Sequence, residues 1–219
     1  MTIIKEPESE VGMTLTDLRE EVFAQGFDDF EGDSAKEAQI NRWINTAYQE
    51  VCLFKDWPFL ESEYEGTLPF AIPNLAKVLD VVSVNNRYNL RPYDRRTLIR
   101  RDPTLEGSGN IAECWFKEGN GTIVVYPKSA SENFRVRFTV VPEELTGVKK
   151  PIVPQRFQYA IVKGAQRWAY MSRDAYSAAE LVEGIFNRAL EQMTKQLLNT
   201  NHDRAKLIEF GSSWRTLRW

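Results

Sequence analysis

The chain passes from helical to strand-like periodicity around residues 34–58, which read SAKEAQINRWINTAYQEVCLFKDWP. Apolar side chains recur there at the spacing of one helix face, at Ile40, Ile44, Ala47, Tyr48 and Val51. This spacing predicts an amphipathic helix of about five turns. The segment 34–37 has the pattern of a capping box and predicts where that helix begins. The helix should end before Trp57-Pro58, because the residue before a proline disfavours the helical conformation.

A shorter helix is predicted upstream, beginning at Thr14. Thr14 and Asp17 form a second capping-box pattern. The apolar residues that follow fall on one helix face, at Leu15, Leu18 and Val22. Gly26 is a natural end for this helix, because glycine readily adopts the left-handed conformation that closes many helices.

A period of two dominates from residue 59 to residue 141. Residues 78–84 alternate like a strand and run into Asn85-Asn86, a pair that favours a tight turn. Residues 111–116 and 122–126 also alternate, and the segment 118–121 between them predicts a hairpin. The clearest strand is 134–141, in which Phe134, Val136, Phe138 and Val140 face one way and Arg135, Arg137 and Thr139 face the other. Three or more strands with one apolar face form a stable antiparallel module.

Helical spacing returns after Pro151 and Pro154. One apolar stripe comprises Phe157, Ile161, Ala165 and Trp168, and a third capping-box pattern at 177–180 precedes another stripe. The chain therefore predicts an α+β fold: a four-helix bundle with an antiparallel β-module inserted between helices 2 and 3, and an extended C-terminal tail. The expected domains are an N-terminal acidic arm with helices 1 and 2 (1–58), the β-module (59–150), helices 3 and 4 (151–200) and the tail (201–219).

Charge is distributed unevenly along the chain. The 219 residues include 28 Lys and Arg against 31 Asp and Glu, which gives a net charge of −3. Residues 1–33 hold two basic and ten acidic side chains, whereas residues 87–101 hold six arginines and one aspartate. Apolar content of 42% is typical of a globular protein, and no run approaches the roughly 20 apolar residues of a membrane span. The sequence predicts an acidic N-terminal region and a basic middle.

Residues able to carry catalysis are scarce. The only histidine, His202, lies among polar residues, and no nucleophile-elbow motif is present. Cys52 and Cys114 are flanked by apolar residues, which favours packed, reduced thiols. The acidic residues between Asp28 and Asp33 lack the glycine and the final glutamate of a calcium loop. We expect no catalytic residue, no metal ligand, no cofactor and no enzymatic activity.

The arginine-rich segment is the first candidate contact site. It contains Arg87, Arg91, Arg95, Arg96, Arg100 and Arg101, interleaved with tyrosine. Arginine pairs with phosphate and tyrosine can stack on bases, so a nucleic-acid surface is one interpretation. The other interpretations are a contact with a neighbouring copy or partner protein, and a plain solvated surface.

The segment 201–219 is the second candidate. It carries Phe210, Trp214 and Trp219 together with a small basic excess. Aromatic side chains of this size are costly to leave in water, and tryptophan and arginine are common interface anchors. The segment is expected either to dock on a partner chain or to fold back on its own helices.

Several segments resemble tailed-phage head-to-tail adaptor, or connector, proteins. They are residues 14–27, the helix INRWINTAYQEV at 40–51 and the following DWPF at 56–59. The segment PQRFQYAIVKGA at 154–165 is similar to the tail tubular protein A type of these adaptors. The resemblance covers mainly the predicted helices.

The resemblance implies a structural virion protein, made in the bacterial cytoplasm, that forms a homo-oligomeric, dodecameric ring. Its implied partners are the portal protein, a downstream tail or nozzle protein and the genomic DNA that crosses the channel, with no membrane. It makes 201–219 a portal-docking arm, with contacts at Phe210, Trp214, Arg215, Leu217, Arg218 and Trp219. Whether residues 87–101 face DNA or protein stays open. The alternative function is that of a nucleic-acid-binding regulatory protein that uses this segment.

Overall fold

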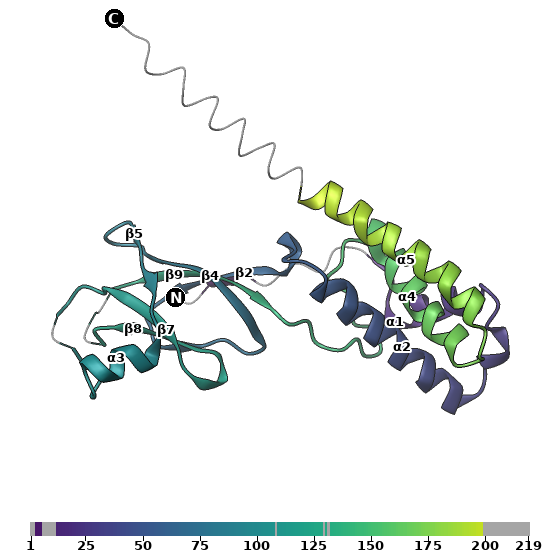
Figure 1. Ribbon diagram of the computed structural model, residues 1–219, viewed down its shortest axis with the longest axis horizontal. Helices are drawn as coiled ribbons and strands as arrows, with labels where there is room; N and C mark the ends of the chain where they lie inside the picture. Colours follow the sequence, from purple (N-terminus) through teal and green to yellow (C-terminus); the bar gives the residue numbers. More distant parts are fainter. Residues whose placement is uncertain (1–2, 6–11, 108, 129, 131, 199–219) are drawn as a thin grey trace, which may run out of the picture. The chain divides into compact units, whose positions relative to one another are not determined.

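The computed structural model describes residues 3–5, 12–107, 109–128, 130 and 132–198, and these fall into two compact units. The helical unit comprises Glu8–Phe59 and Glu144–Trp219, and the strand unit comprises Met1–Pro7 and Leu60–Glu143. Figure 1 shows long helices in one unit, and two sheets with one short helix in the other. The fold is α+β, with the strands inserted between the second helix and the C-terminal helices, as the sequence predicts.

The helical unit is organised around α4. Its helices are α1 (Leu15–Phe23), α2 (Ser34–Leu53), α4 (Gln158–Met171) and α5 (Tyr176–Leu197). α4 packs extensively against α2 and α5, and α1 makes smaller contacts with α2 and α4. The nine residues of α1 cannot run the length of the 20-residue α2. In the part of the chain that is described, the unit is therefore not a clear four-helix bundle, which corrects the prediction.

Local hydrogen bonds explain where the helices begin. At α1 the predicted capping box is confirmed: the Thr14 hydroxyl accepts from the Asp17 amide at 3.2 Å, and the Asp17 carboxylate accepts from the Thr14 amide at 2.7 Å. At α2 the cap is Asp33, whose carboxylate accepts from the Ala35 amide at 3.0 Å, and not the predicted Ser34. The predicted box at 177–180 is also wrong, because α5 already begins at Tyr176.

Two residues from the segments that resemble adaptors fix the middle and the end of α2 to neighbouring backbone. The Asn45 side chain donates to the Leu145 carbonyl at 3.2 Å and accepts from the Leu145 amide at 2.7 Å. The buried Trp57 donates its indole N–H to the Val51 carbonyl at 2.7 Å, which satisfies a carbonyl in the last turn of α2. Both side chains therefore have structural roles in the helical unit.

α4 approaches both α2 and α5 closely at Gly164. A Cβ atom added there would lie 2.7 Å from the Ala47 Cβ of α2 and 3.2 Å from the Phe186 ring of α5. Both neighbours are buried, so neither can move into solvent. The absence of a side chain at Gly164 is what lets α4 pack closely between these two contacts.

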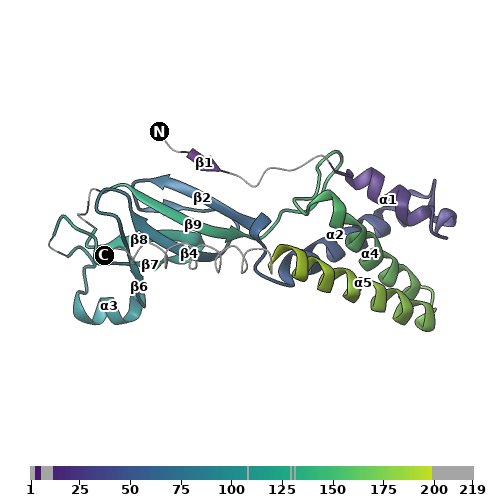
Figure 2. The same ribbon diagram turned by 90° about the horizontal axis from the view of Figure 1, so that it is seen from above.

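The strand unit contains two sheets. One has the order β1 (Ile3–Lys5), β2 (Glu61–Gly66), β9 (Phe134–Val140), β4 (Leu75–Ser83) and β5 (Tyr88–Asn89), and the other β3 (Phe70–Ala71), β8 (Thr122–Tyr126), β7 (Cys114–Lys117) and β6 (Arg91–Pro92). In both views β2, β9 and β4 run side by side (Figures 1 and 2). The pairing is antiparallel except between β6 and β7, which are parallel. The predicted module is therefore not purely antiparallel.

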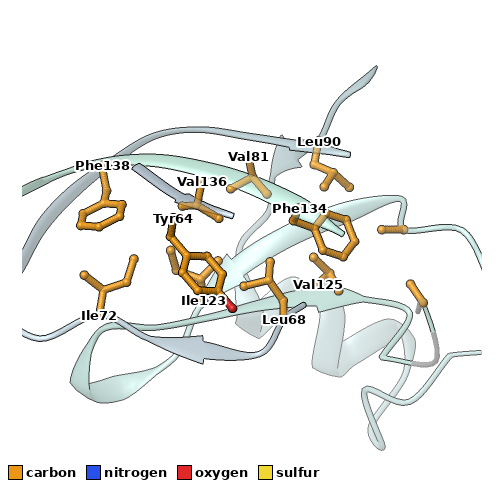
Figure 3. Packing of buried hydrophobic residues seen from close by; sticks show 12 residues of the cluster. Tyr64, Leu68, Ile72, Val81, Leu90, Ile123, Val125, Phe134, Val136 and Phe138 are labelled. Atoms are coloured by element: carbon orange, nitrogen blue, oxygen red, sulfur yellow. The ribbon is translucent and has the colours of Figure 1, made fainter. Parts of the chain in front are cut away.

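A shared apolar core joins the two sheets. β9 contributes Phe134, Val136 and Phe138, and β8 of the other sheet contributes Ile123 and Val125, all within one cluster of buried side chains. Figure 3 shows these side chains pointing toward one another from the two sheets. The predicted alternation of β9 is confirmed for its phenylalanines, valine and arginines, but Thr139 is only 4% exposed although it was expected to face outward.

The outward arginines of β9 bind the carboxylates of the strands on each side. Arg135 pairs with Glu63 and Glu65 of β2 at 3.2 and 3.1 Å. Arg137 pairs with Asp80 of β4. Cross-strand pairs of opposite charge stabilise a sheet modestly. These ion pairs therefore add to the apolar packing that holds β2, β9 and β4 together.

The predicted C-terminal tail, 201–219, lies outside the described residues. Among the described helices, none combines the length and the apolar character needed to cross a membrane.

Replacing Gly164 by leucine should destabilise the helical unit. The new side chain has to displace Ala47 or Phe186, and overpacking of this kind costs about 1–3 kcal/mol. Urea denaturation followed by far-ultraviolet circular dichroism measures the change in the free energy of unfolding. The control is Gly184→Ala on exposed α5 surface, where no described atom lies within 4 Å of the new Cβ and a gain of about 0.5–1 kcal/mol is expected. Equal stability of the two variants would contradict the packing argument.

Candidate functional site

The structure divides the six candidate arginines between the two sheets of the strand unit. Arg87 lies in the turn between β4 and β5, Arg91 lies on β6, and the other four lie on or at the ends of α3 (Arg95–Arg101). All six are exposed. Figure 1 draws β5 and α3 on opposite sides of the strand unit. The four arginines of α3, Arg95, Arg96, Arg100 and Arg101, form the arginine face.

The start of α3 is fixed by an aspartate cap. The Asp94 carboxylate accepts from the Thr97 amide and the Thr97 hydroxyl, both at 3.0 Å. These hydrogen bonds, with that of the hydroxyl first, lower the pKa of Asp94 from its ordinary value. The carboxylate therefore stays ionised and held in place at the helix start.

Two apolar side chains attach α3 to the sheet beneath it, the buried Leu98 and the partly buried Ile99. Leu98 is 2% exposed and packs in a cluster with Cys114 and Phe116 of β7 and Val124 and Tyr126 of β8. The arginines on either side of Leu98 are exposed. α3 is thus a short amphipathic helix whose entire polar face is basic apart from one threonine.

The aspartate after α3 is engaged in its own loop. The Asp102 carboxylate accepts from the Thr104 hydroxyl at 2.7 Å, the Gly107 amide at 2.9 Å and the Tyr126 hydroxyl at 3.2 Å. The Thr104 hydrogen bond is the main reason that the pKa of Asp102 is lowered. Both aspartates that flank α3 hold loop geometry. Asp94 also attracts the Arg96 charge weakly, without an ion pair within 4.0 Å among the described residues.

The arginine face consequently keeps most of its charge unpaired. Arg95 approaches the Glu118 carboxylate at 3.7 Å. Among the described residues, Arg96, Arg100 and Arg101 have no carboxylate within 4.0 Å. Arg96 and Arg100 are four positions apart on one helix, and like charges at that spacing destabilise a helix by about 0.2–0.5 kcal/mol. Guanidinium groups in this state can form bidentate pairs with carboxylates or phosphates.

A buried carboxylate supports the turn that carries Arg87. Glu132, 6% exposed, accepts from the Ser83 hydroxyl and from the Ala112 amide at 3.1 Å. Burial raises the pKa of Glu132, but these hydrogen bonds, with others from Asn86 and Tyr88, outweigh it, and the net pKa lies below its ordinary value. Glu132 therefore ties the β4–β5 turn to the loop before β7.

The acidic N-terminal region also contains unpaired charge. Three of its aspartates are engaged: Asp17 and Asp33 cap helices, and Asp29 pairs with Arg173. The exposed carboxylates without an ion pair or side-chain hydrogen bond among the described residues are Glu20, Glu21, Asp28 and Glu31. These four, on α1 and in the turn after it, are called the acidic edge below.

The remaining candidates lie outside the described residues or are buried. Phe210, Trp214, Arg215, Leu217, Arg218 and Trp219 lie outside the described residues, as does His202. Cys52 and Cys114 are free and buried, as predicted, and burial raises the pKa of both thiols. In the described part of the chain, no group of three or more potential ligands is arranged to hold a metal ion.

The chain matches a known protein family. A family model described as the SU10 adaptor protein matches residues 13–209. This range covers most of the helical unit and the inserted strands from β2 to β9. No curated protein matches the chain.

Replacing Glu132 by glutamine should lower the free energy of unfolding of the strand unit. It should also make that free energy change less as pH falls. Because the folded pKa of Glu132 is lowered, its stabilisation is complete above the ordinary value of 4.5 and is lost as pH falls through the lower folded pKa. Glutamine cannot accept from both Ser83 and Ala112 as the carboxylate does, so the free energy of unfolding at pH 7 should fall by about 1–3 kcal/mol. Urea unfolding between pH 7 and pH 3 tests this, with the exposed Glu113→Gln as the control. A parallel pH dependence in wild type and Glu132→Gln would contradict it.

Proposed function

The chain belongs to the SU10 adaptor protein family, and we propose from this that it forms a ring joining the phage portal to the next tail component. Membership implies a structural, non-enzymatic role as a phage adaptor. The proposal adds that the ring is dodecameric, that it encloses the channel for genomic DNA, and that it lies at the head–tail interface of the virion. The family match over residues 13–209 is the observation that carries the proposal.

Exposed apolar side chains of the helical unit support assembly into an oligomer. Leu53 and Phe54 at the end of α2 are 64% and 44% exposed, and Tyr176 and Leu181 of α5 are 60% and 68% exposed. Burying one large apolar side chain completely stabilises a protein or an interface by about 1.5–3 kcal/mol relative to leaving it in water. Subunit contacts in a ring would bury side chains of this kind.

Residues 201–219 are proposed to dock on the portal. Large aromatic and arginine side chains are the usual anchors of protein interfaces, and this segment supplies Phe210, Trp214, Arg215, Leu217, Arg218 and Trp219. A docking segment gains most of its affinity from a few such anchors. Trp214 and Trp219 are therefore expected to dominate the contact.

Purified wild-type protein mixed with portal rings should yield rings with an added layer in electron micrographs. The same protein imaged alone shows whether the ring forms without the portal. Portal rings that remain bare at micromolar protein concentrations would contradict the proposed function.

Trp214→Ala with Trp219→Ala should reduce portal attachment while leaving the fold intact. Hot-spot side chains contribute about 2 kcal/mol or more each, so attachment should weaken at least roughly thirtyfold. Co-sedimentation with portal rings measures attachment, and circular dichroism checks helix content. The matched control is Lys206→Ala with Glu209→Ala in the same segment. Loss of helix content in the tryptophan variant, or unchanged attachment, would contradict the docking role.

A further inference from the structure

We propose that the arginine face of α3 binds the acidic edge of a second copy of this chain. The contact is head to tail, because one copy contributes its strand unit and the next contributes its helical unit. Such a heterologous contact closes into a ring when its rotation permits. The proposal rests on the proposed ring and names one of its subunit contacts.

On the basic side, Arg96, Arg100 and Arg101 have no ion-pair partner within 4.0 Å among the described residues. Asp94 and Asp102 are occupied by hydrogen bonds in their own loops, and Glu118 approaches only Arg95. Arg96 and Arg100 repel each other along one face of a helix of seven residues. This repulsion is relieved when carboxylates of a partner lie between the two guanidinium groups.

On the acidic side, the free carboxylates are held on well-anchored backbone. Asp28 and Glu31 lie on either side of the buried Phe30, whose ring packs edge-on against Phe27 and at a tilt against Trp43. Arg173 pairs with Asp29 and lies over the Phe27 and Phe30 rings, so Asp29 is already neutralised while Asp28 and Glu31 remain available. A rigid turn presents these two carboxylates at low entropic cost.

Charge balance favours a second copy over DNA as the partner. A nucleic-acid-binding domain usually carries a basic excess, whereas this chain has a net charge of −3 and a pI near 5.5. Among the described residues, every copy brings the four exposed carboxylates of the acidic edge and three arginines of the arginine face without an ion pair within 4.0 Å. The two surfaces therefore occur in equal numbers in any assembly of the chain.

Two charge-reversal variants test the contact. Arg96→Glu with Arg100→Glu makes the arginine face acidic, and Asp28→Arg with Glu31→Arg makes the turn basic. Each variant alone sets like charges against each other, so the concentration needed for self-association should rise at least about tenfold. An equal mixture should assemble at nearly the wild-type concentration, because alternating copies restore opposite charges at every contact. Analytical ultracentrifugation, with and without portal rings, measures the association.

Controls separate this contact from a general charge effect. Lys117→Glu with Lys128→Glu makes the same change in net charge at exposed positions of the same unit, and it should assemble like wild type. Wild-type association should also weaken when ionic strength rises from about 0.1 M to about 1 M, since screening shortens from roughly 10 Å to 3 Å.

The outcomes distinguish the alternatives. Assembly of the Arg96→Glu, Arg100→Glu variant at the wild-type concentration would overturn this contact and leave the ring proposal intact. If the equal mixture of the two charge-reversal variants does not assemble, the contact is overturned as well. It is also overturned if the Arg96→Glu, Arg100→Glu variant assembles like wild type but has lost binding to a DNA duplex. A wild-type chain that stays monomeric both alone and with portal rings would overturn the ring and the contact together.

Discussion

The helical unit depends on the close seating of α4 against α2 and α5. Gly164 permits the approach, and one turn further along α4 Arg167 reaches both partner helices, pairing with Glu50 of α2 at 2.7 Å and Glu183 of α5 at 3.6 Å. The Arg167 side chain is 13% exposed and also lies over the Phe186 ring. The close packing at Gly164 and the partly buried ion pairs of Arg167 therefore lie one turn apart on α4. A larger residue at 164 would move apart the very groups that Arg167 connects.

Much of the fold follows from local patterns, which is why those parts were predictable. The capping box at Thr14, the alternation of β9 and the hairpin at 118–121 each rest on neighbours in sequence. Adjacent residues that could both cap a helix were harder to tell apart. Asp33 caps α2 although Ser34 fits the pattern, because the Asp33 carboxylate can accept from two amides at once. Thr139 is buried although Arg135 and Arg137 of the same strand are exposed, and no periodicity within one strand reveals that.

The candidate site was predictable in composition but not in shape. The basic segment is evident in the sequence, yet its division between a turn of one sheet and a helix on the other depends on a crossover that no local pattern records. α3 itself was missed because a helix of seven residues with one fully buried side chain, Leu98, is too short for periodicity. The available signal was Asp94 followed three residues later by Thr97, which is the cap that the structure contains. The exposed charge of this helix is the surface that the proposed contact between copies uses.

The ion pair between Glu50 and Arg167 also has a consequence for how the protein is made. Its partners are 117 positions apart, and the whole of Leu60–Glu143 lies between them. A ribosome releases α1 and α2 long before α4 exists to cover their apolar side chains. Contacts of such long range form late and slowly, and exposed helix faces can aggregate in the meantime. The intervening strands can fold first around their own apolar core. The order of synthesis therefore favours a nascent chain in which the strand unit folds before α1 and α2 pack against α4 and α5.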